Sequence, residues 1–280
     1  MDSTPLNPPA SARTLPDGTV LRDLLGQAEL DDAVKLQEET WGAGFTERVP
    51  AAILLVGQKI GGISAGAFSS SGALIGFVFG LTGVRNGCLV HWSDMLAVRP
   101  EAQGRHLGEA LKHYQRERCR AIGVETMYWT YDPFVARNAH LNLNRLGATI
   151  DRFVPDMYGA NTNSPMHGNL GTDRFVAAWA VNTEPMPMSD DASLLTGIPC
   201  AGGPPGTAPA DDQPLPDVDA VCVHVPSDYH ALLAHDLELA RLWRASARRA
   251  FVNYLGNGWQ VSAFIPSRDG DATYLITRSA

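Results

Sequence analysis

The sequence predicts an α+β fold whose sheet is mostly antiparallel and flanked by helices. β-prone apolar runs follow one another across short turn segments, which is typical of hairpins. Amphipathic helices that could serve as crossovers between parallel strands are fewer than the hairpin signals. Over residues 18–181 we therefore expect the element order β-α-α-β-β-β-α-β-α-β-β.

The first elements are a strand and two helices. The strand is expected at residues 19–24. Asp31 or Asp32 is expected to cap the first helix, because a side-chain oxygen there can accept from an early backbone N–H. The second helix has Pro50 near its first turn and ends at Gly61.

Three β-prone runs come next, and a helix follows them. "GISAGAF" and "ALIGFVFGLTG" are joined by "SSSG", which predicts a hairpin, and the third run is Cys88–Val98. The helix is expected to end at Gly123. Its apolar side is built by Leu107, Ala110, Leu111 and Tyr114.

The last elements of this domain are a strand, a helix and a hairpin. "VETMYWTYD" is the strand, Asn138–Leu146 is the helix, and Gly147 is its C-terminal stop. "ATIDRFVPDMYG" and "DRFVAAWAV" form a second hairpin with a longer connection.

Composition divides the chain into four segments. Residues 1–17 are a Pro-rich disordered leader without the apolar core of a signal peptide, and residues 18–181 form the first domain. Residues 182–216 are a Pro/Gly-rich linker. Residues 217–280 form a small α/β subdomain with one long helix, capped by Ser227. Because this subdomain is too small to bury a generous core, we expect it to pack on the first domain or on a partner subunit. The second alternative would make the protein a homodimer.

The charge balance excludes several kinds of partner. The net charge is −8 at pH 7, whereas general binding to nucleic acid or anionic membranes needs excess positive charge. No stretch approaches the roughly 20 apolar residues of a membrane span, so we expect a cytoplasmic protein. Four cysteines, Cys88, Cys119, Cys200 and Cys222, stand far apart without a CxxC pair. We interpret them as free thiols of a reduced compartment and expect no metal site.

The segment "VRPEAQGRHLGEALKHYQ", residues 98–115, is the strongest candidate for a binding site. A helix N-terminus attracts phosphate because its first N–H groups lack partners. Gly104 and Gly108 would let phosphates approach the backbone, and Arg105 adds a cation. The plain alternative is an ordinary strand-to-helix turn. The lysine and Ser/Thr of a P-loop and the three glycines of a dinucleotide fingerprint are absent.

Together with "NAHLNLNRLGA", this segment resembles the GCN5-related N-acetyltransferase (GNAT) superfamily. In that family a V-x-P-x-x-[QR]-x-x-G-x-[GA] turn holds the acyl-CoA pyrophosphate, and a later Asn-containing helix ends in L-G-[FA]. "WTYDPFVARNAHLNLNRLGA", "TDRFV" and "ARLWRASARRAF" resemble a narrower group of predicted GNAT acyltransferases with a C-terminal extension. That similarity covers nearly the whole chain.

The resemblance implies a GNAT fold with a small C-terminal α/β extension. It also implies direct attack of a neutral amine on an acyl-CoA, either acetyl-CoA or succinyl-CoA, without a metal. The strand before the turn would splay from the next strand, and pantetheine would lie in that gap, paired with backbone N–H groups. The implied cofactor-binding residues are Leu96, Ala97, Val98, Gln103, Gly104, Arg105, His106, Leu107, Gly108, Glu109 and Asn138.

Two positions depart from the family pattern. His106 stands where the turn usually has Gly. Leu143 stands where the family often has a Tyr that serves as general acid toward the thiolate. Tyr158 is a candidate substitute acid, with aromatic packing as the alternative.

Asp94 is the candidate general base. Strand alternation places Trp92, Asp94, Leu96 and Val98 on one face. In several family members this strand carries the general base at a position that corresponds to Trp92 or Asp94 here. Trp92 cannot titrate, so Asp94 is the candidate. The alternative is that Asp94 is a structural acid. His91 faces the other way and is expected to be structural.

Several other polar residues have two alternative roles each. Asp132 either binds the amine or caps the following helix, and Asn138 either contacts the cofactor or is an ordinary polar residue at a helix start. Three arginines could bind a carboxylate or form surface salt bridges: Arg137, Arg145 and Arg174. Four more are expected on a solvated helix face: Arg241, Arg244, Arg248 and Arg249. Trp243 and Phe251 are expected in a core or an interface.

The function predicted from these residues is transfer of an acetyl or succinyl group from acyl-CoA to the amine of a small molecule or amino acid. Two alternatives belong to other classes. One is a non-catalytic acyl-CoA-binding sensor or scaffold, which the departures at Leu143 and His106 leave open. The other is protein-lysine acylation, with the C-terminal subdomain recognising the partner.

Overall fold

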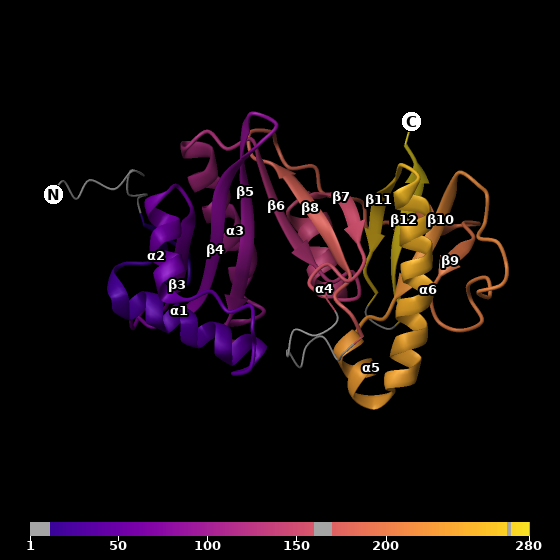
Figure 1. Cartoon of the computed structure of the whole chain (residues 1–280), viewed down its shortest axis with the longest axis horizontal. Helices are drawn as coiled ribbons and strands as arrows, with labels where there is room; N and C mark the ends of the chain where they lie inside the picture. Colours follow the sequence, from indigo (N-terminus) through magenta and orange to yellow (C-terminus); the bar gives the residue numbers. More distant parts are fainter. Residues whose placement is uncertain (1–11, 160–169, 268–269, 280) are drawn as a thin grey trace. The chain divides into compact units, whose positions relative to one another are not determined.

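The computed structural model describes residues 12–159, 170–267 and 270–279 (Figure 1). Contacts group them into two compact units. The first holds residues 12–129 and 179–184, and the second holds the rest. Residues 1–11, the larger part of the expected leader, lie outside the described residues.

One eight-stranded sheet has the order β1-β2-β3-β4-β5-β6-β8-β7. Of the neighbouring strand pairs, β1–β2, β2–β3, β3–β4, β4–β5 and β7–β8 are antiparallel, and β5–β6 is parallel. The strands are β1 (Arg13–Thr14), β2 (Val20–Asp23), β3 (Ile63–Phe68), β4 (Leu74–Arg85), β5 (Cys88–Val98), β6 (Thr126–Tyr131), β7 (Thr149–Val154) and β8 (Arg174–Ala180). The predicted α+β class and element order are confirmed, with β1 added. β1 lies inside the expected leader and is ordered because Arg13 and Thr14 pair with β2.

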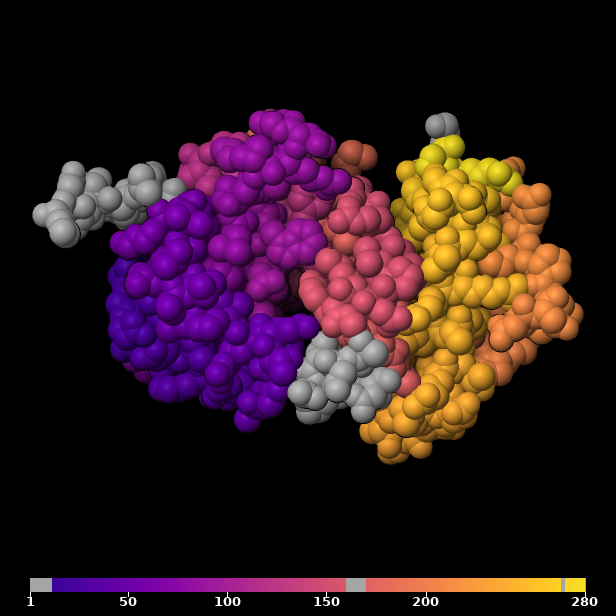
Figure 2. All heavy atoms as spheres, in the orientation of Figure 1, coloured from indigo at the N-terminus to yellow at the C-terminus, as the bar shows by residue number. Residues whose placement is uncertain are grey.

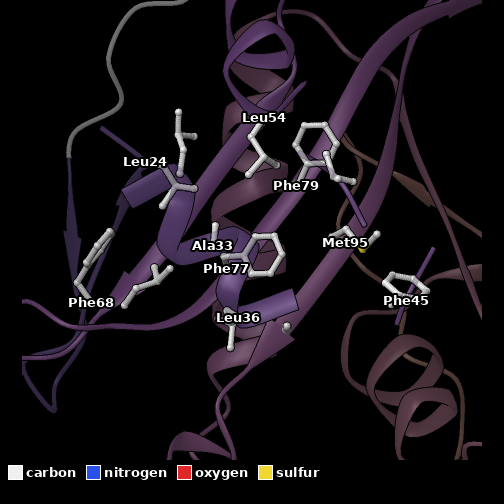
Figure 3. Close-up of a cluster of buried hydrophobic side chains, with 13 residues drawn as sticks. Leu24, Ala33, Leu36, Phe45, Leu54, Phe68, Phe77, Phe79 and Met95 are labelled. Carbon is white, nitrogen blue, oxygen red and sulfur yellow. The ribbon is translucent and has the colours of Figure 1, made fainter. Parts of the chain in front are cut away.

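In the first unit, α1 (Gly26–Trp41) and α2 (Ala51–Lys59) pack on β4 and β5 through an apolar core (Figure 3). That core includes Leu54, Phe77, Phe79 and Met95. The predicted start of α1 at Asp31 or Asp32 is wrong. The helix begins at Gly26, where the Glu29 carboxylate accepts a 2.7 Å hydrogen bond from the Leu25 N–H.

The helix α3 (Leu107–Ala121) meets the sheet through a buried polar network. Gln115 donates its amide N–H to His91 Nε2 at 3.0 Å, and His91 Nδ1 lies 3.0 Å from the Thr82 hydroxyl. A Cβ at Gly80 would lie 2.3 Å from His91 Nε2, so only glycine leaves room for this ring. His91 is thus structural, as its position in the strand predicts.

Lys112 on α3 is enclosed in the same region. Its Nζ donates to the Ser93 hydroxyl at 2.7 Å and lies 4.0 Å from the centre of the Trp129 ring. Both contacts favour the ammonium form. Burial outweighs them and lowers the pKa of Lys112 to about 7.

The second unit contains its own four-stranded sheet, of order β11-β12-β10-β9. Its strands are β9 (Cys200–Gly202), β10 (Ala220–Val225), β11 (Trp259–Ile265) and β12 (Ala272–Arg278). Its helical elements are α4 (Ala136–Ala139), the π-helical segment η2 (His140–Arg145), the 3₁₀ helix η4 (Ala192–Leu195), α5 (Tyr229–His235) and α6 (Leu237–Gly256). α6 forms part of the surface of this unit (Figure 2).

Two expectations for this unit are wrong. The segment 182–216 is more than a linker, because it supplies β9 to the second sheet. The single helix capped by Ser227 is two helices. Asp228 caps α5 by accepting from the Ala231 N–H, and Asp236 caps α6 by accepting from the Leu239 N–H, each at 2.9 Å.

The division into units falls at residue 129 instead of the expected boundary at 181. The reason is an aromatic core that joins β7 and β8 to the C-terminal elements. The Phe175 ring lies 4.8 Å from Phe251 and 5.3 Å from Tyr274, and Phe153 lies 5.3 Å from Phe251. Phe251 is therefore a core residue, as expected.

Among the helices that the structure describes, none combines the length and the apolar character that crossing a bilayer requires.

The buried lysine predicts a pH-dependent stability. Between pH 7 and its ordinary pKa near 10.5, the folded chain holds fewer protons at Lys112 than the unfolded chain. The penalty of burying this charge is therefore full below pH 7 and is relieved as pH rises. We therefore compare the free energy of unfolding of Lys112→Met with that of wild type. This difference should favour the variant more at about pH 6 than at about pH 9, by on the order of 2 kcal/mol. Urea unfolding at both pH values measures this.

Lys59→Met, at an exposed lysine of α2, is the control and should show no such difference. Equal effects of Lys112→Met at the two pH values would contradict a lowered pKa.

Candidate functional site

A β-bulge at Asp94 organises the middle of β5. In the ladder with β4, Ser93 pairs with Gly80 and Met95 pairs with the adjacent Phe79, so Asp94 is the extra residue. Such an insertion bends the strand and reverses which face the following side chains occupy.

The prediction that Trp92, Asp94, Leu96 and Val98 share one face is consequently wrong. Before the bulge, His91 and Ser93 contact α3. After it, Met95 and Ala97 belong to the core under α1 and α2. Trp92 therefore lies on the opposite face from Leu96 and Val98.

The same strand leaves backbone groups open beyond the bulge. The parallel ladder with β6 pairs only Val90, His91 and Trp92, six residues short of the end of β5 at Val98. Toward β4, the Arg99 N–H donates to Ile75 O at 2.9 Å. In an antiparallel pair the backbone N–H groups of successive residues point alternately toward and away from the partner strand. Because the Arg99 N–H points toward β4, the N–H groups of Val98 and Leu96 point away from it. In the described residues, neither is paired by the ladder with β6.

The predicted phosphate turn follows β5 directly. It starts with the 3₁₀ helix η1 (Pro100–Ala102), and the Gln103 amide donates to Val98 O at 3.0 Å. The helix α3 then begins at Leu107 with His106 as its N-cap, and no side chain caps its first N–H groups. The unpaired N–H groups and the positive end of the helix dipole make this terminus suited to an anion.

His106 is explained by the backbone. Its φ is 57° and its ψ is 20°, which is the left-handed region. Glycine is favoured there, and histidine is among the side chains that tolerate it. Its ring points into solvent, with 74% of the side chain exposed, and Nδ1 lies 3.4 Å from Glu109 Oε2. Gly104 also has positive φ, 78°, and a Cβ there would meet open space.

Arg105 has a partner within its own unit. Its guanidinium forms an ion pair with Asp17. The Thr19 backbone N–H, together with Arg105, lowers the pKa of Asp17 to about 2. A phosphate at this turn would therefore share Arg105 with a carboxylate.

Asp94 combines access with an altered acidity. It is exposed to solvent, yet desolvation by surrounding protein atoms raises the pKa of its carboxyl above the ordinary value. A carboxylate that water reaches, and that holds a proton more readily than a free one, is suited to accept a proton.

Asp132, in the second unit, is fully engaged. Its Oδ1 accepts from the Phe134 N–H at 2.9 Å and its Oδ2 accepts from Arg244 at 2.7 Å. Burial opposes ionisation, but Arg244 and Arg174 prevail and keep the pKa of this carboxyl below its usual value. Its contacts are those of an acid that fixes the chain after β6.

Tyr158 lies beside the end of β6. Its hydroxyl is 3.0 Å from the Thr130 hydroxyl, and the Arg174 guanidinium carbon lies 5.6 Å from its ring centre. Arg174 also approaches Asp132 at 3.8 Å. The structure thus brings Tyr158, Arg174 and Asp132 together, and Arg174 is a buried residue and not a surface cation.

The expected Asn helix is α4 continued by η2. Asn138 is half-buried in α4. Leu143 is fully buried in η2, so the position aligned with the family's acid carries a core side chain. Arg137 and Arg145 are exposed.

The solvated face predicted for the α6 arginines is wrong for two of them. Arg244 is 3% exposed and donates to Tyr229 Oη at 3.0 Å as well as to Asp132. Arg248 bonds Asp173 at 2.6 Å and Asp156 at 2.9 Å. These partners are distant in sequence, and periodicity alone does not locate them.

The four cysteines are free thiols, as expected. Two of them, which stand far apart in sequence, nevertheless meet in the fold. β9 and β10 pair in parallel with Cys200 opposite Cys222, and His224 adjoins them. The signal in the sequence was the C-x-H spacing of Cys222 and His224, which places both side chains on one face if the segment is a strand.

A cavity of about 570 Å³ lies in the second unit. It is lined by segment 214–217, α6, β11 and β12, with Arg278 placed 4.9 Å from the Trp259 ring centre. None of the residues predicted for the site lines it.

No protein-family model matches the chain, and no curated protein matches it. Solved structures do resemble it. The ribosomal-protein-S18-alanine N-acetyltransferase from Escherichia coli is 17% identical, with 59% of this chain and 95% of that chain covered and a TM-score of 0.45. A putative acetyltransferase from Salmonella typhimurium with its cofactor acetyl-CoA is 17% identical, with 62% and 98% covered and a TM-score of 0.45.

A GNAT superfamily phosphinothricin acetyltransferase from Sinorhizobium meliloti in complex with acetyl-CoA is 19% identical, with 60% and 93% covered and a TM-score of 0.45. Likenesses at these identities and TM-scores do not carry an activity to this chain.

The turn yields a prediction with a matched control. Gly104 and Gly72 have φ of 78° and 83°, and a Cβ at either meets open space. Substitution by alanine should therefore cost each site a similar amount, about 1 kcal/mol. Only Gly104→Ala should weaken CoA binding, by about tenfold or more, because its Cβ stands where an anion would approach the backbone. Calorimetric titration with CoA measures both; equal affinities would remove the turn from the binding site.

Proposed function

We propose that the chain is an acyl-CoA-dependent N-acyltransferase that transfers an acetyl or succinyl group to the amine of a small molecule or amino acid. The observation that carries this proposal is one continuous feature of the first unit. Open backbone N–H groups at Leu96 and Val98 lead directly to the uncapped N-terminus of α3. An extended amide chain ending in a pyrophosphate matches both parts, as the GNAT resemblance implies.

The chain's residues fit such a donor by their chemistry. Amide carbonyls of pantetheine can accept from the free β5 N–H groups, and the pyrophosphate can accept from the first N–H groups of α3. The positive φ at Gly104 and His106 turns the backbone between these two parts. When bound, the acyl-CoA supplies an activated thioester. A β5 N–H directed at its carbonyl oxygen would stabilise negative charge developing there.

Asp94 is the proposed base. At the bulge its carboxylate is free of the ladder and open to solvent, so it can take a proton from the ammonium form of the acceptor, directly or through water. Asp132 is a weaker candidate, because both of its oxygens accept hydrogen bonds from the protein.

Tyr158 is the proposed acid toward the leaving thiolate in the place of the family's tyrosine. Its support is the phenol hydroxyl, which can donate a proton and lies 3.0 Å from the Thr130 hydroxyl. Buried Leu143 supports the second candidate function, an acyl-CoA-binding sensor without turnover, since it takes the usual acid's place.

The experiment that tests the function is thiol release from acetyl-CoA and succinyl-CoA with a panel of amines and amino acids. Release with a small amine is the expected result. Stabilisation by CoA without release on any acceptor would favour the sensor, and acylation of a folded protein alone would favour lysine acylation. If no CoA species raises the melting temperature, the donor assignment is wrong.

Asp94→Asn should lower kcat by about 100-fold or more, since an amide cannot act as a base, and should leave CoA affinity unchanged. In wild type, activity should rise with pH as the carboxyl deprotonates. Because desolvation raises this pKa, the acidic limb should lie above the ordinary carboxyl range. The limb should vanish in Asp94→Asn. Asp31→Asn, at an exposed aspartate of α1, is the control. A full rate for Asp94→Asn at saturating amine would remove Asp94 from the mechanism.

A further inference from the structure

The second sheet gathers two thiols and an imidazole at one place. Parallel pairing sets Cys200 of β9 opposite Cys222 of β10. His224 is two residues beyond Cys222 on the same strand, and alternate residues of a strand share a face. The two sulfur atoms and a ring nitrogen all lie within 4.8 Å of one another.

We propose that Cys200, Cys222 and His224 bind a zinc ion that fastens β9 to β10. Two thiolates and one imidazole form a ligand set that Zn²⁺ prefers. Proteins with catalytic zinc use the same set with a fourth position open, and structural sites close that position with another ligand.

The spacing agrees with tetrahedral coordination. Zn–S and Zn–N bonds of about 2.3 and 2.05 Å at a tetrahedral angle place sulfur and nitrogen about 3.6 Å apart. The distance from Cys222 Sγ to His224 Nε2 is 3.7 Å. Small side-chain movements would therefore be enough to accommodate the ion.

The imidazole is also held in a suitable orientation. His224 Nδ1 lies 2.8 Å from the Thr273 hydroxyl, which sits opposite it in the ladder between β10 and β12. When Nδ1–H donates to this hydroxyl, Nε2 is unprotonated and faces the Cys222 sulfur. Metal-binding histidines usually have such a partner behind the ring, and it fixes both tautomer and orientation.

Burial and charge suit a site that shields an ion but still admits it. Cys222 is buried, whereas Cys200 and His224 are half-buried. Asp271, which immediately precedes β12, interacts electrostatically with both Cys200 and His224. A water molecule would complete the tetrahedron.

A bound ion would have a structural consequence. β9 is only three residues long and comes from a Pro/Gly-rich segment, so its ladder supplies few hydrogen bonds. Coordination across the β9–β10 pair adds a crosslink, and binding to the folded state alone stabilises that state.

The test uses the full chain, kept reduced, stripped with a chelator and titrated with zinc against a chromophoric chelator. One ion per chain should bind, and cobalt should give thiolate charge-transfer bands. Cys200→Ser and Cys222→Ser should each weaken zinc binding at least about 100-fold. Cys88→Ser, at a half-buried cysteine of β5, is the matched control and should bind normally.

Two further variants separate coordination from folding. His224→Cys keeps a ligand and should retain zinc while strengthening the charge-transfer bands. Thr273→Val should weaken binding by about 10- to 100-fold. Chelation should lower the melting temperature of wild type but not of Cys200→Ser. Absence of zinc binding to the reduced chain, as when Cys200 and Cys222 serve only as a disulfide, would overturn the proposal. Retention of the ion by the Cys200→Ser/Cys222→Ser double variant would overturn it too.

Discussion

The first unit depends on one constraint, which is that β5 pairs with two neighbours only over part of its length. Beyond Trp92, in the part of the chain that the structure describes, the strand stays paired with β4 but the ladder with β6 has ended. The bulge at Asp94 lies where the pairing with β6 ends. It reverses which face of the sheet the following side chains occupy, and it leaves the Asp94 carboxylate in solvent beside the unpaired edge of the strand. The free N–H groups, the turn after Val98 and the start of α3 follow from that geometry.

The contact between β5 and α3 holds the unpaired edge of β5 in place. His91, Gln115 and Lys112 fill the contact between β5 and α3 with buried polar side chains. The Gln115 amide N–H bonds His91, and the Lys112 ammonium bonds Ser93. Gly80 permits the close approach of the His91 ring. A buried, directional network specifies register more sharply than apolar packing, and register is what aims the N–H groups. The position of α3, and thus of its N-terminus, rests on this network.

The second unit is organised by pairings between residues far apart in sequence. Arg244 and Arg248 of α6 hold Asp132, Asp156 and Asp173, and an aromatic core joins Phe153 and Phe175 to Phe251 and Tyr274. These contacts explain why the C-terminal elements and the second hairpin form one unit. They also account for Asp132. The sequence places it at a strand end, where it could bind the amine or cap the following helix, and the fold uses it as an anchor.

The sequence by itself determined the α+β class, the bounds of β5 at Cys88 and Val98, the glycine stops of the helices and the turn before α3. Those features depend on the periodicity and the backbone preferences of residues that are close together in the sequence, so they can be predicted from short segments. Tertiary structure alone decided the bulge at Asp94, the burial of Arg244 and Leu143, and the meeting of Cys200 with Cys222 and His224. Each of these depends on a partner strand or helix, and one unpaired residue in a ladder changes every face after it.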